Sequence, residues 1–295
     1  MLTASPPLDR LTWTWQGYPI QYTVMGSGQP LLLIHGFGAS IGHWRQNIPV
    51  LAEAGYQVWA IDLLGFGGSG KPPIAYSLSV WQEMLKDFWQ QHMQKPTIFV
   101  GNSIGGLLSL MMVADHPDLA AGAILLNCAG GLNHRADELN PFLALIMASF
   151  TRLVATPIIG EWLFEQIRQK SRIRSTLQQV YCHPAAITDE LVDLLYQPAC
   201  DVGAQKVFAS ILTAPAGPRP EELLPKLRHP LLVLWGEGDP WTPIQRGKTF
   251  EQYVSNLDYQ FIGIPETGHC PHDERPELVN RLMLDWLDQR FSRQN

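Results

Sequence analysis

A serine at the tip of a sharp turn constrains the fold of this chain more than any other feature. The run Thr97–Val100 is rich in β-branched and aromatic residues, ends in Gly101-Asn102-Ser103-Ile104-Gly105, and is followed by a helix-forming run at Leu107–Asp115. Such a turn strains the backbone at its tip, and the two glycines remove the Cβ atoms that would clash there. We therefore predict a nucleophile elbow that raises the Ser103 hydroxyl above a sheet, at the positive end of a helix. The alternative is a tight strand–helix turn with a solvated serine.

Length and composition favour a large globular domain. The chain has 295 residues, of which 46% are hydrophobic and 16% charged, which suits one large domain or a core with an inserted subdomain. The net charge of −6, without a long basic block, makes nucleic acid an unexpected partner.

The cysteines and the N-terminus bear on metal binding and cellular address. Cys128, Cys182, Cys200 and Cys270 are widely spaced without a Cys-x-x-Cys pair, so we expect free thiols, no metal and no cofactor. Residues 1–10 contain two prolines and no apolar run, so no secretory signal is expected. Together these features predict a cytoplasmic protein.

Strand and helix patterns alternate along most of the chain. An initial β-hairpin around Gly17 is followed by patterns that predict a mostly parallel central sheet with helices on both faces. The hairpin strands are Leu11–Trp15 and Pro19–Val24, the later strands are Leu31–His35, Gln57–Asp62, Thr97–Val100, Gly122–Asn127, Pro230–Trp235 and Asp258–Ile264, and the helices are Ile41–Ala54, Ser77–His92, Leu107–Asp115, Gln245–Val254 and Pro276–Arg290.

The alternation stops between residues 132 and 222, where helical patterns are broken by prolines. We predict a helical cap (132–222) inserted into a core formed by residues 1–131 and 223–295. In the charge-poor run Leu139–Gly160, Phe142, Ile146 and Phe150 are candidate substrate-binding residues, although a cap helix packed on the core explains most of this run equally well. The basic residues that follow are expected to be solvated or to contact anionic lipid, and they are Arg168, Lys170, Arg172 and Arg174.

Polar residues at the ends of the predicted strands identify the catalytic site. In parallel sheets ligands bind beyond the carboxyl ends of the strands, where His35, Asp62, Ser103 and Asp239 fall. A serine nucleophile needs a base, and the base needs an orienting acid, in the chain order Ser, acid, His in this architecture. Asp239 follows the strand at 230–235, and His269 follows the last strand after Gly268. We therefore predict the triad Ser103, Asp239 and His269.

Several other residues compete for these roles. Glu237 could replace Asp239 only through a different loop path, and His272 is expected to be structural or at the surface. Asp62 is expected to hold the backbone amides of the glycine-rich loop that follows it. The predicted oxyanion donors are the backbone N–H groups of Phe37 and Ile104, whereas His35 is expected to be structural.

These motifs together resemble the α/β-hydrolase fold superfamily, over nearly the whole chain from Leu11 to Arg290. The segments 101–106, 125–127, 235–244 and 268–274 are similar to those of the pheophytinase and chlorophyll dephytylase group. The resemblance implies a serine hydrolase that cleaves the phytyl ester of chlorophyll or pheophytin, a small-molecule lipophilic substrate. It also implies contact of the cap with photosynthetic membranes. The alternatives are a carbon–carbon bond hydrolase, a perhydrolase, a general carboxylesterase or a non-catalytic binding protein of the same fold.

Overall fold

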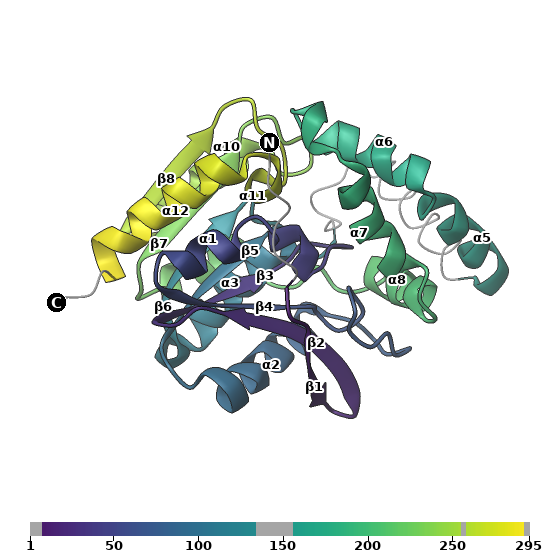
Figure 1. Ribbon diagram of the computed structural model, residues 1–295, viewed down its shortest axis with the longest axis horizontal. Coiled ribbons are helices and arrows are strands. Elements are labelled where there is room, and N and C mark those ends of the chain that lie inside the picture. Colours follow the sequence, from purple (N-terminus) through teal and green to yellow (C-terminus); the bar gives the residue numbers. More distant parts are fainter. Residues whose placement is uncertain (1–7, 134–155, 255–257, 292–295) are drawn as a thin grey trace.

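The computed structural model describes residues 8–133, 156–254 and 258–291. Its centre is an eight-stranded sheet in the order β1-β2-β4-β3-β5-β6-β7-β8 (Figure 1). The strands are β1 (Leu11–Trp15), β2 (Tyr18–Met25), β3 (Gln29–Ile34), β4 (Tyr56–Ile61), β5 (Thr97–Asn102), β6 (Ala120–Leu126), β7 (Leu231–Gly236) and β8 (Tyr259–Ile264). Strand β2 pairs antiparallel with both β1 and β4, and all other neighbours are parallel. The predicted mostly parallel sheet is confirmed.

Some of the helices cover the two faces of this sheet, and others lie beside it (Figure 1). They are α1 (Ile48–Glu53), α2 (Leu78–Phe88), α3 (Ile104–Asp115), α5 (Pro157–Ile167), α6 (Lys170–Val180), α7 (Asp189–Ala199), α8 (Ala204–Leu212), α9 (Pro220–Leu223), α10 (Ile244–Lys248), α11 (Pro271–Glu274) and α12 (Pro276–Phe291). Helices α1 and α12 lie on one face, and α2 lies on the other (Figure 1).

Alternating residues of the central strands supply the two halves of the core. Leu32 and Ile34 of β3 pack in the cluster that contains α2 and α3, whereas Leu31 and Leu33 pack with α1 and α12. Because both faces are covered, such a strand is apolar throughout, which explains its unbroken hydrophobic sequence.

The expectation of one continuous helix over residues 41–54 is wrong. A short 3₁₀ turn spans Ile41–Trp44, and α1 begins only at Ile48. Pro49 lies in the first turn of α1, where its missing N–H group is tolerated, so it favours a new helix start at this point. The helix expected at 245–254 is likewise divided, because α10 ends at Lys248 and a 3₁₀ turn follows at Thr249–Tyr253.

The order of the strands creates a crevice beside β5. The chain passes from β3 to β4 on one side and later places β5 on the other side of β3. The loops that follow β3 and β5 therefore diverge at neighbouring strand ends, with Ile34 paired to Gly101. Such a switch point is where open α/β sheets bind ligands.

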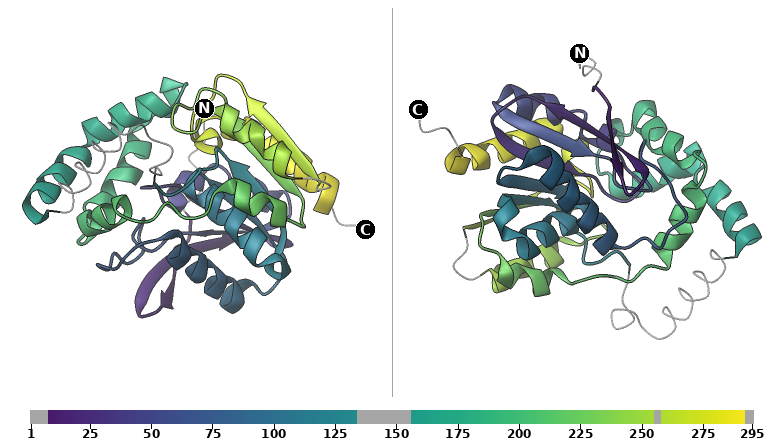
Figure 2. Two further views of the ribbon diagram at one scale, coloured as in Figure 1. Left: turned by 180° about the vertical axis from the view of Figure 1, so that it is seen from behind. Right: turned by 90° about the horizontal axis from the view of Figure 1, so that it is seen from below.

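The described part of the segment between β6 and β7 is helical. Helices α5 to α8, which we call the cap helices, lie together to one side of the sheet in all three views (Figures 1 and 2). The loops at the carboxyl ends of β3, β4 and β5 line a cavity together with residues of α5, α6, α7 and α8. The site is therefore built between the sheet and the cap helices.

Candidate active site

Ser103 occupies the sharp turn between β5 and α3. Its backbone angles are φ 57° and ψ −120°, a conformation that a side chain rarely adopts. Hydrogen bonds fix it in place, because Ser103 N–H donates to the Leu126 carbonyl at 3.0 Å and the Ser103 carbonyl accepts from Ala129 N–H at 3.0 Å. Strain of this kind costs about 1–3 kcal/mol and persists only where the surroundings enforce it.

The glycines of the pentapeptide are required by close backbone contacts. A Cβ on Gly101 would lie 2.0 Å from the Gly105 carbonyl oxygen, and a Cβ on Gly105 would lie 2.2 Å from that of Ile34. No side chain fits at such distances. The sequence pattern therefore has the physical cause expected of an elbow.

Asp239 lies on the loop after β7 and is held by five hydrogen bonds. Its Oδ2 atom lies 2.6 Å from His269 Nδ1 and 2.7 Å from Asn127 Nδ2, and it also accepts from the Thr242 hydroxyl. Its Oδ1 atom accepts from the backbone N–H groups of Trp241 and Thr242, at 2.8 and 3.1 Å. Asp239 and His269, predicted as acid and base, are thus in direct contact.

The protonation states of this pair follow from their partners. Burial would raise the pKa of Asp239, but the hydrogen bonds and positive charge of His269, with the donors of Thr242, outweigh burial and lower the pKa of Asp239. The ionised carboxylate accepts a hydrogen bond from the Nδ1–H group of His269, which leaves Nε2 as the basic nitrogen of the ring.

The residues that competed for the acid and base roles make other contacts. Glu237 is exposed, and its carboxylate lies against Gly263 of β8. His272 is fully buried and its ring packs 4.1 Å from that of Trp44, so it is structural and not at the surface. Asp62 accepts from the backbone N–H groups of Ile41 and Gly68, as expected of an amide-holding residue.

His35 is also structural. Its Nδ1–H group donates to the Gly36 carbonyl at 2.7 Å, and its Nε2 atom accepts from Leu63 N–H at 3.0 Å. Both nitrogens are therefore used, and burial lowers the pKa of His35, which keeps the ring neutral.

Two backbone N–H groups are available near Ser103. The Phe37 N–H follows β3 and the Ile104 N–H begins α3, and within the described residues neither donates to a protein acceptor. Donors without a protein partner at a helix N-terminus suit a developing negative charge. Both groups therefore remain candidates for the predicted oxyanion hole.

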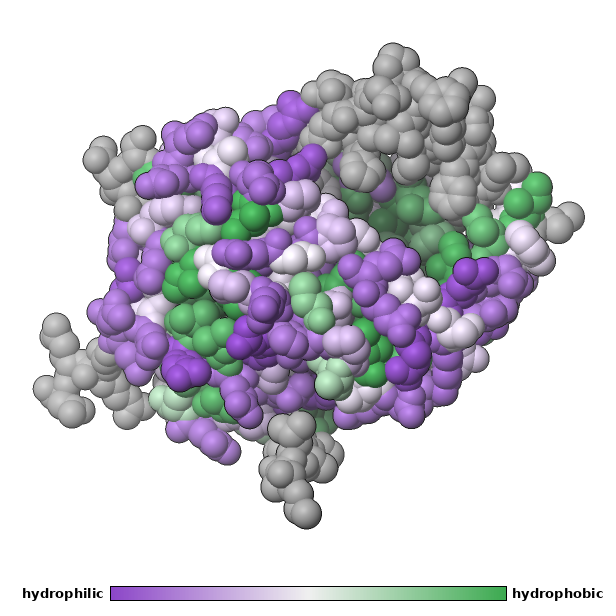
Figure 3. All heavy atoms as spheres, turned by 90° about the horizontal axis from the view of Figure 1, so that it is seen from above, coloured by the Kyte–Doolittle hydropathy of each residue, from purple (hydrophilic) through white to green (hydrophobic). Residues whose placement is uncertain are grey.

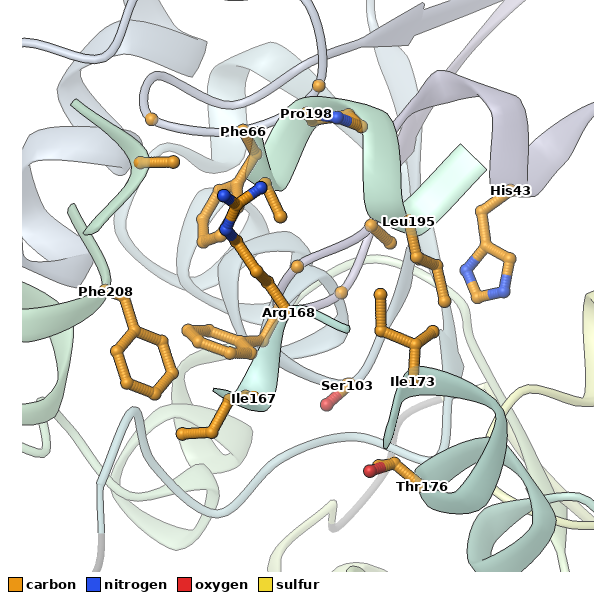
Figure 4. Close-up of a pocket in the computed structure, with 18 of the residues that line it drawn as sticks. His43, Phe66, Ser103, Ile167, Arg168, Ile173, Thr176, Leu195, Pro198 and Phe208 are labelled. Carbon is orange, nitrogen blue, oxygen red and sulfur yellow. The ribbon is translucent and has the colours of Figure 1, made fainter. Parts of the chain in front are cut away.

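One cavity of about 270 Å³ is lined by Ser103, His269 and the oxyanion candidate Phe37, together with Gly36 and Asn102. Most of the other lining residues are apolar, and Figure 4 shows Ser103 among side chains such as Phe208, Ile167, Ile173 and Leu195. Apolar surface also appears in a hollow on the side of the molecule where the cap helices lie (Figure 3). The cavity suits a largely apolar small molecule.

Two basic side chains also line this cavity. The Lys71 ammonium donates to Asp201 at 2.8 Å and to the Gly67 carbonyl at 2.7 Å. Arg168, labelled in Figure 4, donates to Glu165 at 2.6 Å, and its buried Nε–H group has no hydrogen-bond partner within the part of the chain that the structure describes. Among the other basic residues predicted to form a solvated face, Lys170 pairs with Asp193 and Arg174 with Asp189.

The end of α6 is bound to the histidine loop. His269 N–H donates to the Val180 carbonyl at 2.8 Å, and a Cβ on Gly268 would lie 1.9 Å from that oxygen. The Glu274 carboxylate accepts from Gly268 N–H at 2.7 Å and from His183 N–H at 2.8 Å. Burial raises the pKa of Glu274, and these hydrogen bonds oppose the rise. His269, the candidate base, is thus positioned by a cap helix as well as by the core.

A buried network lies behind this contact. His43 donates from Nε2 to the Tyr181 hydroxyl at 3.0 Å, and that hydroxyl donates to Asp273 at 2.8 Å. Arg45 also donates to Asp273, at 2.6 Å. Burial lowers the pKa of His43 to about 4, against the attraction of Asp273.

Sequence reasoning missed Asn127, Thr242 and Glu274 as positioning groups. Asn127 lies just beyond β6, so the rule that located Asp239 could also have found it. The predicted substrate residues Phe142, Ile146 and Phe150 lie outside the described residues.

Neither a metal cluster nor a membrane span occurs among the described residues. No group of three His, Cys, Asp or Glu side chains there is arranged to hold a metal ion, and the four cysteines are free thiols. None of the helices in the described ranges combines the length and apolarity that crossing a bilayer requires.

Known proteins share this sequence and architecture. The sequence profile of the alpha/beta hydrolase family matches residues 31–282. The chain is 28% identical to chloroplastic pheophytinase of Arabidopsis thaliana, over 87% of this chain and 60% of that protein. It is 28% identical to a 2-hydroxy-6-oxo-6-(2'-aminophenyl)hexa-2,4-dienoic acid hydrolase of Metapseudomonas resinovorans, over 93% of this chain and 89% of the other. The crystal structure of a membrane phospholipase A, a bacterial virulence factor, matches with a TM-score of 0.76 and 27% identity, over 96% of this chain and 86% of that one.

Proposed function

We propose, since this chain belongs to the alpha/beta hydrolase family, that it is a serine hydrolase that cleaves a lipophilic carboxylic ester. Hydrolase activity is shared by the relatives, and the ester bond and the lipophilic substrate are our proposal. The observation that carries it is the buried Asp239–His269 pair, 2.6 Å apart, whose His269 lines the same apolar cavity as Ser103. A binding protein would not need an acid, a base and a strained serine together.

The reaction begins with attack of the Ser103 hydroxyl on the ester carbonyl. His269 Nε2 accepts the hydroxyl proton, and Asp239 stabilises the resulting imidazolium. The carbonyl oxygen becomes negative and accepts from the N–H groups of Phe37 and Ile104, each worth about 3 kcal/mol in such sites. The carbon–oxygen bond then breaks, His269 donates its proton to the leaving alkoxide, and water hydrolyses the acyl-enzyme by the same steps.

The apolar cavity and the relatives support a large hydrocarbon substrate. We propose a phytyl ester of chlorophyll or pheophytin, because a pheophytinase is among the relatives and a phospholipase has a similar structure. Each buried methylene of such a chain contributes about 0.8 kcal/mol to binding. The chain spans 60% of the pheophytinase's length, so the substrate is inferred from the shared part alone.

The cap also offers a surface for membranes. Helix α5 exposes Trp162 at 63% and Ile159 at 44%, and Ile167 of the same helix lines the cavity. Tryptophan prefers the interface of a bilayer, where its ring is half in lipid and half in water. We propose that this helix contacts the membrane from which a lipophilic ester is taken.

Product analysis tests the proposal. The purified protein is incubated with chlorophyll a, pheophytin a and p-nitrophenyl butyrate, and the products are separated by chromatography. We expect free phytol and the dephytylated pigment, formed by the wild type and not by Ser103→Ala. Hydrolysis of the aryl ester without any release of phytol would refute the pigment substrate but leave the esterase proposal intact.

A second candidate is hydrolysis of an oxo-dienoic acid. The Metapseudomonas relative is named for such a substrate, which has no ester, so its hydrolysis must break a carbon–carbon bond. Arg168 lines the cavity, and its positive charge favours an anionic substrate of this kind. Turnover of the dienoic acid, lost in Arg168→Gln, without turnover of any ester would favour this candidate over the first.

A further inference from the structure

Two apolar clusters with different chemistry form parts of the cavity wall, which also includes Trp241. The phenylalanine wall is a continuous row of rings, with centroid distances of 5.6 Å from Phe66 to Phe37, 6.1 Å from Phe37 to Phe208 and 5.4 Å from Phe208 to Phe164. The aliphatic wall comprises Ile173, Leu177, Val180 and Leu195. The two walls come from different helices, since α5 and α8 carry half of the first, and α6 and α7 carry the second.

The phenylalanine wall keeps ring surface free for a ligand. Phe37 is 43% exposed although it is a large apolar side chain, and Phe208 is half-buried. Its members meet one another edge-on or tilted. Aromatic rings gain about 0.5–1.5 kcal/mol from a further aromatic neighbour beyond the burial of area, so this wall favours an aromatic group.

The general base is joined to the aliphatic wall through its backbone, and its ring lies edge-on to Trp241, with ring centroids 5.3 Å apart. His269 N–H donates to the Val180 carbonyl at 2.8 Å, and the next residue, Cys270, packs in the same cluster as Leu177 and Val180. In ester cleavage His269 must hand its proton to the leaving oxygen, which requires contact at hydrogen-bond distance. The first atoms of the leaving alcohol therefore lie beside this wall.

The oxyanion site belongs to the phenylalanine wall. Its donor, the Phe37 N–H, is in the same residue as the ring that joins Phe66 and Phe208 in the row. The acyl carbon stays bonded to Ser103 while its oxygen is held at this donor. The acyl chain consequently begins next to Phe37, whereas the leaving alcohol begins next to His269.

We propose that the two walls divide the substrate, with the acyl group on the phenylalanine wall and the leaving alcohol on the aliphatic wall. The class of substrate is then an ester of an aromatic acid with a long aliphatic alcohol. This inference rests on the proposed esterase function and adds the orientation of the ester. In the reaction a bond forms between Ser103 Oγ and the acyl carbon, and the bond between the acyl carbon and the alkoxy oxygen breaks. His269 takes the serine proton and transfers it to that oxygen, which releases the alcohol.

Two isomeric esters test the orientation. Dodecyl 3-phenylpropanoate has an aromatic acid and an aliphatic alcohol, whereas 3-phenylpropyl dodecanoate reverses the two with the same atoms. We expect kcat/KM to be about tenfold higher for the dodecyl ester. Equal values, or a preference for the reversed ester, would overturn the assignment.

Variants of half-buried wall residues localise the effect. Ile173→Ala should lower kcat/KM for dodecyl 3-phenylpropanoate about fivefold and leave methyl 3-phenylpropanoate unchanged, because the methyl ester has no chain to contact this residue. Phe208→Leu, which keeps the bulk but removes the ring, should lower kcat/KM for both esters and slow hydrolysis of their common acyl-enzyme. Val202→Ala is the control, since Val202 is 98% exposed and does not line the cavity.

The opposite pattern, in which Ile173→Ala slows hydrolysis of the acyl-enzyme and Phe208→Leu does not, would overturn the division. Equal losses on both esters in both folded variants would also overturn it, because the walls would then act as one pocket. Failure of the wild type to hydrolyse any of these esters would refute the proposed esterase function itself, and the division of its substrate with it.

Discussion

Replacing Asp239 by asparagine should disable the candidate base and weaken the fold at once. The carboxylate accepts five hydrogen bonds, two at Oδ1 from backbone N–H groups and three at Oδ2 from His269, Asn127 and Thr242. An asparagine has one acceptor oxygen. If this oxygen keeps the hydrogen bonds from the two backbone N–H groups, the NH₂ group of the asparagine faces the donor groups of His269, Asn127 and Thr242.

The three facing groups respond differently. The Thr242 hydroxyl can turn to accept, but the Asn127 NH₂ group cannot, and an unpaired buried donor costs about 1–3 kcal/mol of stability. His269 can accept only in the tautomer with its proton on Nε2, where it is no longer a base. This loss should lower kcat by about a thousandfold or more, equivalent to about 4 kcal/mol of transition-state stabilisation.

Steady-state kinetics with a short aryl ester and urea unfolding measure the two effects on the same preparation. The matched control is Glu237→Gln, on the same loop but exposed, which should change both quantities little. A larger kinetic loss in Glu237→Gln than in Asp239→Asn would move the acid to Glu237. A loss below tenfold in Asp239→Asn would refute the tautomer argument.

Three further predictions concern the supporting residues. Asn127→Ala removes the 2.7 Å donor to Asp239 and should lower kcat about tenfold with KM unchanged, as read from initial rates; an unchanged kcat would show that Thr242 and the backbone suffice. The pKa of His43 is about 4 in the folded protein and about 6.5 in an unfolded chain, so the unfolded chain binds the proton first as the pH falls. The free energy of unfolding should therefore fall by about 3 kcal/mol as the pH drops from 6.5 to 4. Urea unfolding of His43→Gln, which keeps a donor for Tyr181, should show a shallower fall, and an equal slope would assign the effect to other groups. Gly268→Ala places a Cβ 1.9 Å from the Val180 oxygen and should lower both the melting temperature and kcat; wild-type values of both would contradict that contact.

The sequence predicted Ser103, Asp239 and His269 from local rules, and in the structure Asp239 contacts His269. Gly101 and Gly105 flank Ser103 at the spacing of a nucleophile elbow, and Asp239 follows a strand end. The parallel sheet was equally predictable, since strands buried on both faces are apolar throughout. Local chemistry and strand order were therefore enough to predict the sheet and to propose the candidate site.

Other parts of the site depend on contacts between distant segments. Glu274 binds His183 across 91 positions, and no spacing rule links two such residues. The phenylalanine wall joins Phe37 and Phe66 of core loops to Phe164 and Phe208 of the cap helices, where helical periodicity says nothing of which face meets the core. The sequence instead predicted substrate-binding residues in the charge-poor run Leu139–Gly160, and these residues, Phe142, Ile146 and Phe150, stay predictions.

Labelling of the nucleophile tests the central claim most directly. The protein is treated with a fluorophosphonate, digested, and analysed by mass spectrometry, in parallel with Ser103→Ala whose folding is checked by thermal unfolding. We predict that Ser103 alone carries the label, that labelling abolishes hydrolysis of p-nitrophenyl butyrate, and that Ser103→Ala folds but neither reacts nor hydrolyses. Label on another residue, or undiminished ester hydrolysis by Ser103→Ala, would contradict the account.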